Sequence, residues 1–238
     1  MTRRRWIADE VAGNTASMTG PHADHLTRVL RARVGQEFDV VANGVVHSGR
    51  VMTIGEHRVE FELGQAIRSE AAPADLTLLL AIFKFDRMEW AIEKATELGV
   101  ARMIPVIAHR TDTHLAAAAQ KRIERWRRIA VQASEQSRRV AVPEIALPTK
   151  LWDAIRPADS MKIVLSETEE QASLGEILTE HENSKQLFLA IGPEGGWTQA
   201  ELDLFQKEGW ISVSLGPTIL RAETATIAVV AIAMSHLA

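Results

Sequence analysis

After residue 73 the chain alternates between short, continuously apolar runs and amphipathic segments, and this alternation limits the possible folds more than any other feature of the sequence. A short apolar run predicts a strand that is buried on both faces. Strands of this kind alternating with helices predict an α/β fold, with a mostly parallel sheet and helices on both of its faces. The predicted strands span residues 76–82, 102–107, 162–165, 186–191 and 211–214, and the predicted helices span residues 86–98, 117–136, 173–180, 198–208 and 221–237.

Two of the predicted helices carry further signals. Asp86 and Glu89 have the spacing of a capping box, and Gly99 stands where a left-handed residue ends a helix. The helix of residues 117–136 is expected to bury the apolar side that holds Trp126. Its opposite side is then a solvated basic stripe, formed by Lys121, Arg125 and Arg128.

The first 70 residues have a different pattern. Asn43-Gly44, the strongest short hairpin signal, separates predicted strands at residues 37–42 and 45–54, and a third strand follows at 57–67. One helix is expected at residues 22–30, with Leu26, Val29 and Leu30 on one face. Short strands with tight turns suggest a small barrel. Because Pro73 interrupts the chain where the pattern changes, we expect one domain at residues 1–72 and a second at 73–238.

Composition excludes several classes of protein. The absence of cysteine excludes a disulfide scaffold and a thiolate metal site, and the histidines lack the carboxylate neighbours of a metal site. No signal peptide is visible, and the longest apolar run, residues 225–234, is too short to cross a membrane. We therefore expect a cytoplasmic protein with no metal and no membrane association.

Charge is unevenly distributed along the chain. The net charge is -4. Residues 1–70 contain 9 basic and 9 acidic residues, and residues 71–150 contain 13 basic and 9 acidic residues. Residues 151–238 contain 5 basic and 13 acidic residues. A middle segment with a net charge of +4 is compatible with an anionic partner, although solvated helix faces that differ by chance explain it equally well.

Two loops of the predicted sheet are expected to carry chemistry, because ligands bind beyond the carboxyl ends of parallel strands. The first, residues 192–197, contains three glycines, which let a ligand approach the backbone closely; its simpler interpretation is an ordinary glycine-rich connection. The second loop leads into a helix that is apolar nearly all round yet begins with Arg221 and Glu223. Burying these charges is costly unless they have partners, so they indicate either an active site or an ion pair of Arg221 with Glu223 or Glu194 that only holds the loop.

Phosphate-binding signatures are missing from both loops. No G-x-G-x-x-G follows a strand, and the chain has no G-x-x-x-x-G-K-[ST]. A standard dinucleotide or P-loop site is therefore disfavoured, which favours an unusual cofactor pocket.

Several motifs along the whole chain resemble those of the RsmE-type ribosomal RNA methyltransferases of the SPOUT superfamily. These are the IGPEGG sequence at 191–196, LGP at 215–217 with LRAET at 220–224, HLTRVLR at 25–31, RMEWAIEKATELGV at 87–100, and EQSRR at 135–139 ahead of VPEI at 142–145. Along the chain, these motifs occur in the same order as in the family.

This resemblance implies an N-terminal PUA-like β-barrel that binds RNA and a C-terminal α/β domain with a trefoil knot. It also implies a homodimer with S-adenosylmethionine (SAM) bound in the knot. Carried over by motif, the residues expected to bind the cofactor are Leu165, Gly192, Pro193, Gly195, Gly196, Leu215, Gly216, Leu220, Ala222, Thr224 and Ala225. Trp197, directly after the glycines, is expected to flank either the cofactor or a partner subunit.

The family methylates N3 of one uridine in 16S ribosomal RNA, so the expected partner is this RNA or the small ribosomal subunit. N3 is a weak nucleophile while its proton remains, and a catalyst must assist proton loss or stabilise the charge that develops on the uridine oxygens. Arg221 is the candidate for electrostatic stabilisation, and Glu194 and Glu223 are candidates for a base or an orienting group. The candidate RNA-binding residues are Arg5, Arg28, Arg31, Lys84, Arg110, Arg138 and Arg139.

The chain departs from the family pattern at three positions. Arg138 stands where a small residue, commonly glycine, is usual, Ala222 replaces a threonine, and Thr218 stands where an arginine is frequent. These departures leave two alternatives open. One is a SPOUT methyltransferase that acts on another RNA, and the other is a non-catalytic RNA-binding factor for ribosome assembly.

Overall fold

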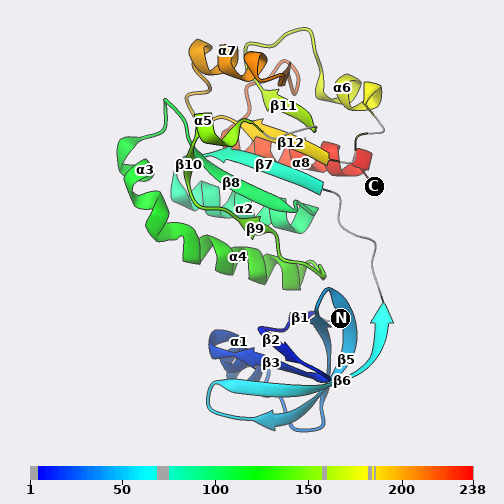
Figure 1. Cartoon of the computed structure of the whole chain (residues 1–238). Helices are drawn as coiled ribbons and strands as arrows, with labels where there is room; N and C mark the ends of the chain where they lie inside the picture. The colour runs from blue at the N-terminus through cyan, green and yellow to red at the C-terminus, as the bar shows by residue number, and fades with distance from the viewer. Residues whose placement is uncertain (1–4, 69–74, 157–159, 182–183, 185, 238) are drawn as a thin grey trace. The chain divides into compact units, whose positions relative to one another are not determined.

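The computed structural model describes the chain except for residues 1–4, 69–74, 157–159, 182–183, 185 and 238. It divides into two compact units, one of Met1–Ala72 with Ser134–Val142 and one of Pro73–Ala133 with Pro143–Ala238 (Figure 1). The segment Ser134–Val142 thus groups with the first unit, whereas the sequence pattern assigned it to the second domain. No described helix has the length and apolarity that crossing a membrane requires.

The first unit is built on a six-stranded sheet in the order β1-β4-β5-β6-β3-β2. Its strands are β1 (Trp6–Ile7), β2 (Glu10–Ala12), β3 (Thr15–Thr19), β4 (Glu37–Ala42), β5 (Val45–Ile54) and β6 (Arg58–Arg68). All neighbouring pairs are antiparallel except β1 and β4. The predicted hairpin is confirmed, with φ values of 51° at Asn43 and 79° at Gly44 as its tight turn requires. The three short strands β1 to β3 had no signal in the sequence pattern.

The helix expected at residues 22–30 begins earlier and changes its winding. Helix α1 (Gly20–Asp24) continues into a π-helical turn, η1 (His25–Val29), in which the N–H of Leu30 donates to the carbonyl of His25, five residues back. This wider turn rotates the following side chains away from the core. Leu26 is buried, but Val29 and Leu30 are 63% and 45% exposed, so the predicted common face of these three residues is wrong.

Glu135 joins the segment 134–142 to the first unit. Its side chain is fully buried, its carbonyl accepts from the N–H of Arg5 at 3.3 Å, and its Oε1 accepts from the N–H of Ile7 at 3.3 Å. The guanidinium of Arg5 in turn donates to the carbonyl of Arg138. These bonds connect the segment to strand β1, so a run of residues far along the chain completes the N-terminal unit.

Asp9 is linked to Glu135 through His22, whose Nε2 lies 4.0 Å from Glu135 Oε1. His22 Nδ1 lies 3.1 Å from Asp9 Oδ1, and the N–H of Thr19 donates to Asp9 Oδ2 at 2.7 Å. Burial alone raises the pKa of Asp9, but the interactions with His22 and Thr19 outweigh it and lower the pKa below the usual value. The ionised carboxylate therefore stabilises the fold at neutral pH, and this contribution is lost as the pH falls through the lowered pKa.

The second unit holds a seven-stranded sheet in which every pair is parallel, which confirms the predicted class. Its path runs β10-β8-β7-β12-β11-β13, and β9 also pairs with β8. The strands are β7 (Asp75–Ala81), β8 (Arg102–Ile107), β9 (Glu144–Ile145), β10 (Thr149–Lys150), β11 (Met161–Leu165), β12 (Gln186–Ile191) and β13 (Ile211–Val213). Because β11, β12 and β13 are parallel, their carboxyl ends lie at one edge.

Helices cover both faces of this sheet (Figure 1). They are α2 (Phe85–Leu98), α3 (Thr113–Ala119), the 3-10 turn η2 (Gln120–Arg122), α4 (Ile123–Gln136), α5 (Leu151–Ala154), α6 (Leu174–Glu180), α7 (Gln199–Lys207) and α8 (Ala222–Leu237). Phe188 and Ala190 of β12 pack in a cluster with Leu151 of α5 and Phe205 of α7. Helices α2 and α8 pack on each other, and α8 contacts β12. The continuous apolar runs therefore correspond to strands that bury alternate residues on opposite faces.

Two predictions about helix ends have different outcomes. Gly99 has a φ of 112° and ends α2, as expected. The capping box of Asp86 and Glu89 is wrong, because Lys84 occupies the N-cap without a side-chain bond. Glu89 instead accepts two hydrogen bonds from Arg125 of α4, at 2.6 and 2.7 Å. A bidentate pairing with an arginine is stronger than a bond to the helix terminus, and it ties α2 to α4.

The long helix predicted at 117–136 is broken by η2, but its buried side is as expected. Ile123, Trp126, Ala130 and Ala133 are all buried, while Lys121, Arg125 and Arg128 are exposed. The first part, α3, starts earlier than expected because Asp112 accepts from the N–H groups of His114 and Leu115 and so caps it.

Gly99 is also a packing site, which gives a first test of the fold. A Cβ at this residue would lie 2.7 Å from Cε of Met234 in α8. Gly99→Ala combines this overlap with a left-handed backbone, so we expect it to lower the free energy of unfolding by about 2 kcal/mol in urea denaturation. The control is Gly175→Ala in α6, where a Cβ meets nothing within 4 Å. It is expected to be neutral or to stabilise by up to about 1 kcal/mol, and equal losses in both variants would contradict the packing argument.

Candidate functional site

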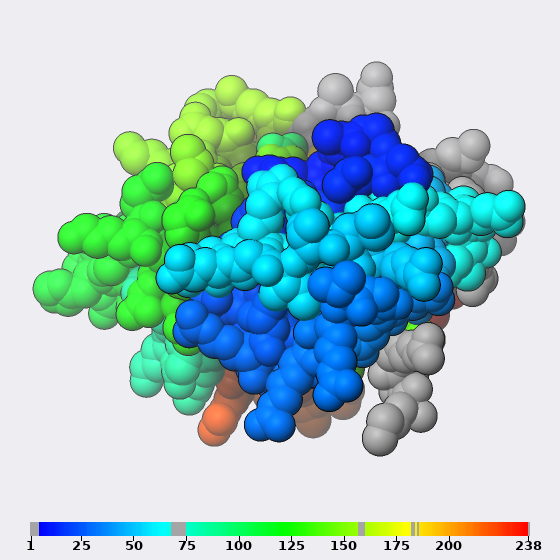
Figure 2. Space-filling model, turned by 90° about the horizontal axis from the view of Figure 1, so that it is seen from below, coloured from blue at the N-terminus to red at the C-terminus, as the bar shows by residue number. Residues whose placement is uncertain are grey.

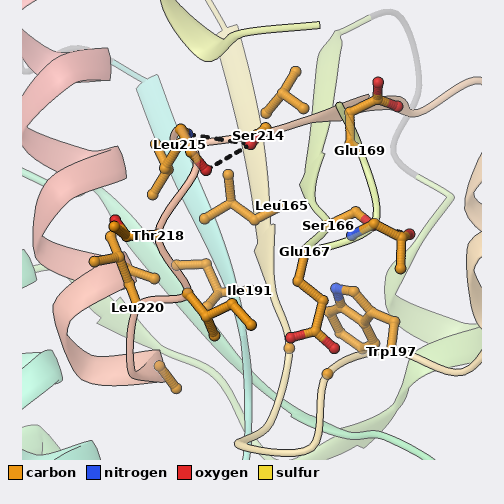
Figure 3. Close-up of a pocket in the computed structure, with 18 of the residues that line it drawn as sticks. Leu165, Ser166, Glu167, Glu169, Ile191, Trp197, Ser214, Leu215, Thr218 and Leu220 are labelled. Carbon is orange, nitrogen blue, oxygen red and sulfur yellow. Dashed lines mark hydrogen bonds between the residues drawn. The ribbon is translucent and has the colours of Figure 1, made fainter. Parts of the chain in front are cut away.

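Three loops of the second unit enclose a cavity of about 800 Å³. They follow β11, β12 and β13, so the cavity lies at the edge where the carboxyl ends of these strands meet. The lining comes from residues 165–173, from 191–197 without 195, and from 213–222, with Arg87, Leu202 and Ala225 in addition. Figure 3 shows Leu165, Ile191 and Ser214 at the ends of the three strands and the loop residues around them.

The loop after β12 is held in a tight turn. The N–H of Gly196 donates to the carbonyl of Pro193 at 2.8 Å, and Gly196 has a φ of 68°. The capping box that the sequence predicted for the next helix is confirmed: Thr198 accepts from the N–H of Glu201, and Glu201 accepts from the N–H of Thr198 at 2.8 Å. The loop is thus fixed at both ends, which leaves its backbone facing the cavity.

The loop after β13 turns at Gly216, which has a φ of 112°. Ser214 Oγ accepts from the N–H of Gly216 at 3.1 Å and lies 3.2 Å from its carbonyl, the two contacts dashed in Figure 3. The chain then enters α8, where Thr226 donates to the carbonyl of Ala222 at 2.7 Å. Small side chains at the start of α8 let it form one wall of the cavity.

The loop after β11 forms the third wall, and of this loop the sequence analysis named only Leu165. Residues 166–173 all line the cavity. Glu169 Oε1 accepts from the N–H groups of Gln171 and Ala172 at 2.9 and 3.2 Å, and these backbone bonds lower the pKa of Glu169. The same rule that selected the other two loops applied here, because residues 166–173 follow a buried strand of the same sheet.

Most of the residues expected to bind the cofactor meet at this cavity. Those that line it are Leu165, Gly192, Pro193, Gly196, Leu215, Gly216, Leu220, Ala222 and Ala225. Gly195 and Thr224 do not line it. Gly195 packs against the side chain of Arg110, whose guanidinium donates to the carbonyl of Gly195 and, at 3.3 Å, to that of Trp197.

The three candidate catalytic residues lie in different surroundings. Arg221 and Glu194 line the cavity and are exposed, and Glu194 Oε1 accepts from the N–H of Lys84 at 3.4 Å. Glu223 is buried, does not line the cavity, and has its Oε1 3.6 Å from Nε of Arg87. Its Oε2 is buried without a hydrogen-bond partner in the described part of the chain. The ion pair that holds the start of α8 therefore involves Arg87, which itself lines the cavity, and not Arg221 as one interpretation of the sequence had it.

The candidate RNA-binding residues separate into two groups. Arg28, Arg31, Lys84 and Arg110 are exposed, and Arg28 lies 3.6 Å from Asp24 in the preceding helical turn. Arg5, Arg138 and Arg139 belong instead to the region where the segment 134–142 packs. Burial there lowers the pKa of Arg139 to about 10, so the guanidinium stays charged at neutral pH.

Arg138 adopts a left-handed backbone with a φ of 63°. Its Nη2 lies 3.9 Å from Oδ2 of Asp39. Glycine adopts a left-handed backbone at a lower conformational free energy than any other residue. This explains why the family pattern has a small residue, commonly glycine, at this position. The departure at Arg138 therefore concerns the backbone and packing of the first unit.

Across the residues that the structure describes, no group of three or more His, Asp or Glu side chains is placed to hold a metal ion.

The lining of the cavity is rich in carboxylates. Its lining includes Glu167, Glu169, Glu170 and Glu194 against Arg87 and Arg221.

Comparison with known families identifies the second unit. A model of the RNA methyltransferase domain family matches residues 70–234. The ribosomal RNA small subunit methyltransferase E of Aquifex aeolicus is 30% identical over 231 residues, with 97% of this chain and 98% of that protein covered. The protein of the same name from Bacillus subtilis is 28% identical over 222 residues, with 90% and 87% covered.

Solved structures have the same fold over nearly the whole chain. A ribosomal RNA small subunit methyltransferase E from Neisseria gonorrhoeae bound to S-adenosyl methionine has a TM-score of 0.85 and 31% identity, with 96% of this chain and 95% of that chain covered. A methyltransferase-like protein from Legionella pneumophila in complex with the bound cofactor SAM has a TM-score of 0.83 and 26% identity, with 99% and 96% covered.

The ion pair behind the cavity gives a test of its construction. Arg87→Ala leaves the buried carboxylate of Glu223 without its counter-ion, so we expect the free energy of unfolding to fall by about 2 kcal/mol. Adding Glu223→Gln removes the unpaired charge and is expected to recover about half of that loss. Urea denaturation of the two single variants and the double variant measures the coupling. A double variant that is less stable than Arg87→Ala alone would show that Glu223 is stabilised by something other than Arg87.

Proposed function

The chain belongs to the RNA methyltransferase family and, within it, to the ribosomal RNA small subunit methyltransferase E group, and from this premise we propose that it methylates N3 of one uridine in 16S ribosomal RNA. It is a SAM-dependent ribosomal RNA methyltransferase. The proposal concerns the atom that is methylated, the residues that act, and the partners of the chain.

The cavity at the carboxyl ends of β11, β12 and β13 is the observation that supports this function best. Its volume of about 800 Å³ suits a ligand of the size of SAM. SAM carries a sulfonium and an ammonium cation against one carboxylate, and the cavity offers four glutamates against two arginines. The left-handed residues Gly196 and Gly216 expose bare backbone at one position in each of two walls. Size, charge and backbone access therefore all fit this cofactor.

Bound SAM supplies an electrophilic methyl group on a neutral leaving group, so the protein must deliver the uridine in line and handle its N3 proton. Arg221, exposed at the cavity, is placed to stabilise negative charge on the uridine O2 or O4 as the proton leaves. Glu194, also exposed there, is the candidate acceptor of that proton. Glu223 holds Arg87 in the cavity wall, which makes it a positioning residue.

The RNA surface that we propose includes the exposed arginines of the first unit. Arg28, Arg31 and Arg33 are exposed and are neighbours in sequence of Val29, Leu30 and Val34, whose apolar side chains are 45–66% exposed. Figure 2 looks onto the surface of this unit, coloured blue to cyan. Cations meet phosphates, and apolar side chains meet unstacked bases, so this surface suits folded RNA. Because N3 lies on the pairing edge, the target uridine must be turned out of any helix.

The homodimer implied by the family resemblance is also a proposal, supported by the second unit. Helix α8 is apolar almost throughout, yet Ile232 is 40% exposed, and Trp90 of α2 is 45% exposed. Exposed apolar side chains on two helices that pack on each other are typical of a subunit interface. The expected site of action is the cytoplasm, on the RNA or on the assembled small subunit.

Methyl transfer by an Arg221→Ala variant tests the proposed mechanism. With 16S ribosomal RNA and radiolabelled SAM, we expect kcat to fall by about 10²- to 10³-fold because one electrostatic stabiliser is lost, with the dissociation constant of SAM unchanged. The control is Arg102→Ala, since Arg102 begins β8 at the opposite, amino-terminal edge of the sheet. A normal rate in Arg221→Ala would remove this residue from the mechanism, and methylation at an atom other than N3 would change the assigned product.

RNA binding by an Arg28→Ala, Arg31→Ala double variant tests the RNA surface. The logarithm of RNA affinity falls as the logarithm of salt concentration rises, and the magnitude of this negative slope is expected to decrease by between about 1 and 2, because two phosphate contacts are lost. Arg58→Ala is the matched control in the same unit, since Glu10 and Glu60 already pair with Arg58. An unchanged slope in the double variant would place the RNA elsewhere.

A further inference from the structure

Trp197 is a buried side chain with an unused hydrogen-bond donor. It is 7% exposed, and its ring packs edge-to-face on Phe205 with 5.0 Å between the ring centroids. Its indole Nε1 is buried and has no acceptor in the described part of the chain. Trp210, which packs on the other side of Phe205, donates from its Nε1 to the carbonyl of Ile155 at 2.8 Å. An indole N–H that lacks such an acceptor is unusual in a protein interior and calls for an explanation.

The unused donor belongs to the wall of the cavity. Trp197 lines it, and a Cβ on Gly192 would lie 3.3 Å from both Nε1 and Cε2 of the indole. The N–H edge of the ring therefore rests against the bare backbone of Gly192, which is itself a lining residue. Nε1 itself is buried, and Gly192 places no side chain against it.

Glu167 contributes an acceptor that lies against the same glycine loop. Its Oε1 would lie 2.7 Å from a Cβ on Gly196, so the carboxylate rests on the residue directly before Trp197. Figure 3 shows Glu167, from the loop after β11, beside Trp197, from the loop after β12. The carboxylate of Glu167, which only accepts hydrogen bonds, and the indole N–H of Trp197, which only donates, thus both lie against the backbone of residues 192–196.

The chemistry of this pair selects the group that it can hold. A carboxylate of the ligand would be repelled by Glu167, and an ammonium group has no lone pair for the indole N–H. A hydroxyl group fits both, because it donates to the carboxylate and accepts from the indole. Carboxylates bind ribose hydroxyls in this way in other nucleotide sites. We infer that Trp197 Nε1 and Glu167 together hold a ribose hydroxyl of the bound cofactor. This inference rests on the proposed cofactor site, and it makes Trp197 a positioning residue.

Calorimetric titration with S-adenosylhomocysteine, which keeps the ribose and does not react, tests the pair. Trp197→Phe preserves the ring that packs on Phe205 and removes only the N–H, so we expect the dissociation constant to rise about tenfold. Glu167→Gln is expected to raise it by a smaller factor, since the amide oxygen still accepts. The matched control is Trp126→Phe, because Trp126 also has a buried Nε1 without a described acceptor but does not line the cavity. Its dissociation constant should stay within about twofold of the unchanged chain.

The 2′-deoxy and 3′-deoxy forms of the same ligand identify the group that is held. For the form that lacks the held hydroxyl, Trp197→Phe should cause no further loss of affinity, while the other form should still lose about tenfold. An equal loss with both deoxy forms would overturn the ribose assignment and point to the adenine edge, which also places a donor beside an acceptor.

An observation on the unsubstituted protein completes the test. In a spectrum of ¹⁵N-labelled indoles, the resonance absent from Trp197→Phe should move on ligand addition, and its N–H should exchange with water more slowly. Unchanged exchange, or wild-type affinity in Trp197→Phe, would refute the role of Trp197. If the unsubstituted protein binds neither SAM nor S-adenosylhomocysteine, the proposed function itself fails, which is a separate outcome.

Discussion

The second unit depends on one constraint: its sheet is parallel and buried on both faces. Helices occupy both of those faces, so a ligand finds room at the strand ends. Because β11, β12 and β13 are parallel, their three carboxyl ends coincide, and loops separated by about 20 residues of chain become the walls of one cavity. The apolarity of the strands thus determines where the cavity forms.

Sequence reasoning was most accurate where one periodic signal dominated. Strands β4, β5, β8 and β12 have the predicted bounds, since each is a run with uniform patterning between clear turns. Sequence reasoning failed where contacts between distant parts of the chain determine the local structure. β9 and β10 have two residues each and exist through their pairing with β8, and Glu89 left its expected cap for Arg125, 36 residues away. The π-helical turn that exposes Val29 and Leu30 likewise has no signature in the apolar spacing.

The residues of the candidate site were likewise predicted where the sequence carried a local signal, and were missed where it did not. Glycines and the charged start of α8 identified two walls, because these residue types are unusual in their positions. The third wall, residues 166–173, is rich in glutamate and resembles an ordinary exposed loop, so composition alone could not select it. Glu223 shows a different limit. Its charge in an apolar helix indicated a function, but its partner, Arg87, came from a helix more than 130 residues earlier. The trefoil knot implied by the family resemblance remains a prediction.

The three walls of the cavity also appear in a fixed order while the chain is being synthesised. The loop after β11 emerges from the ribosome first, the glycine loop second, and the start of α8 last. A nascent chain that ends just after the glycine loop lacks the whole segment 213–225, so one wall of the cavity is missing. Met234, which fits against Gly99 at the end of α2, is synthesised later still. A cavity with all three walls therefore exists only in chains that have been synthesised through the start of α8.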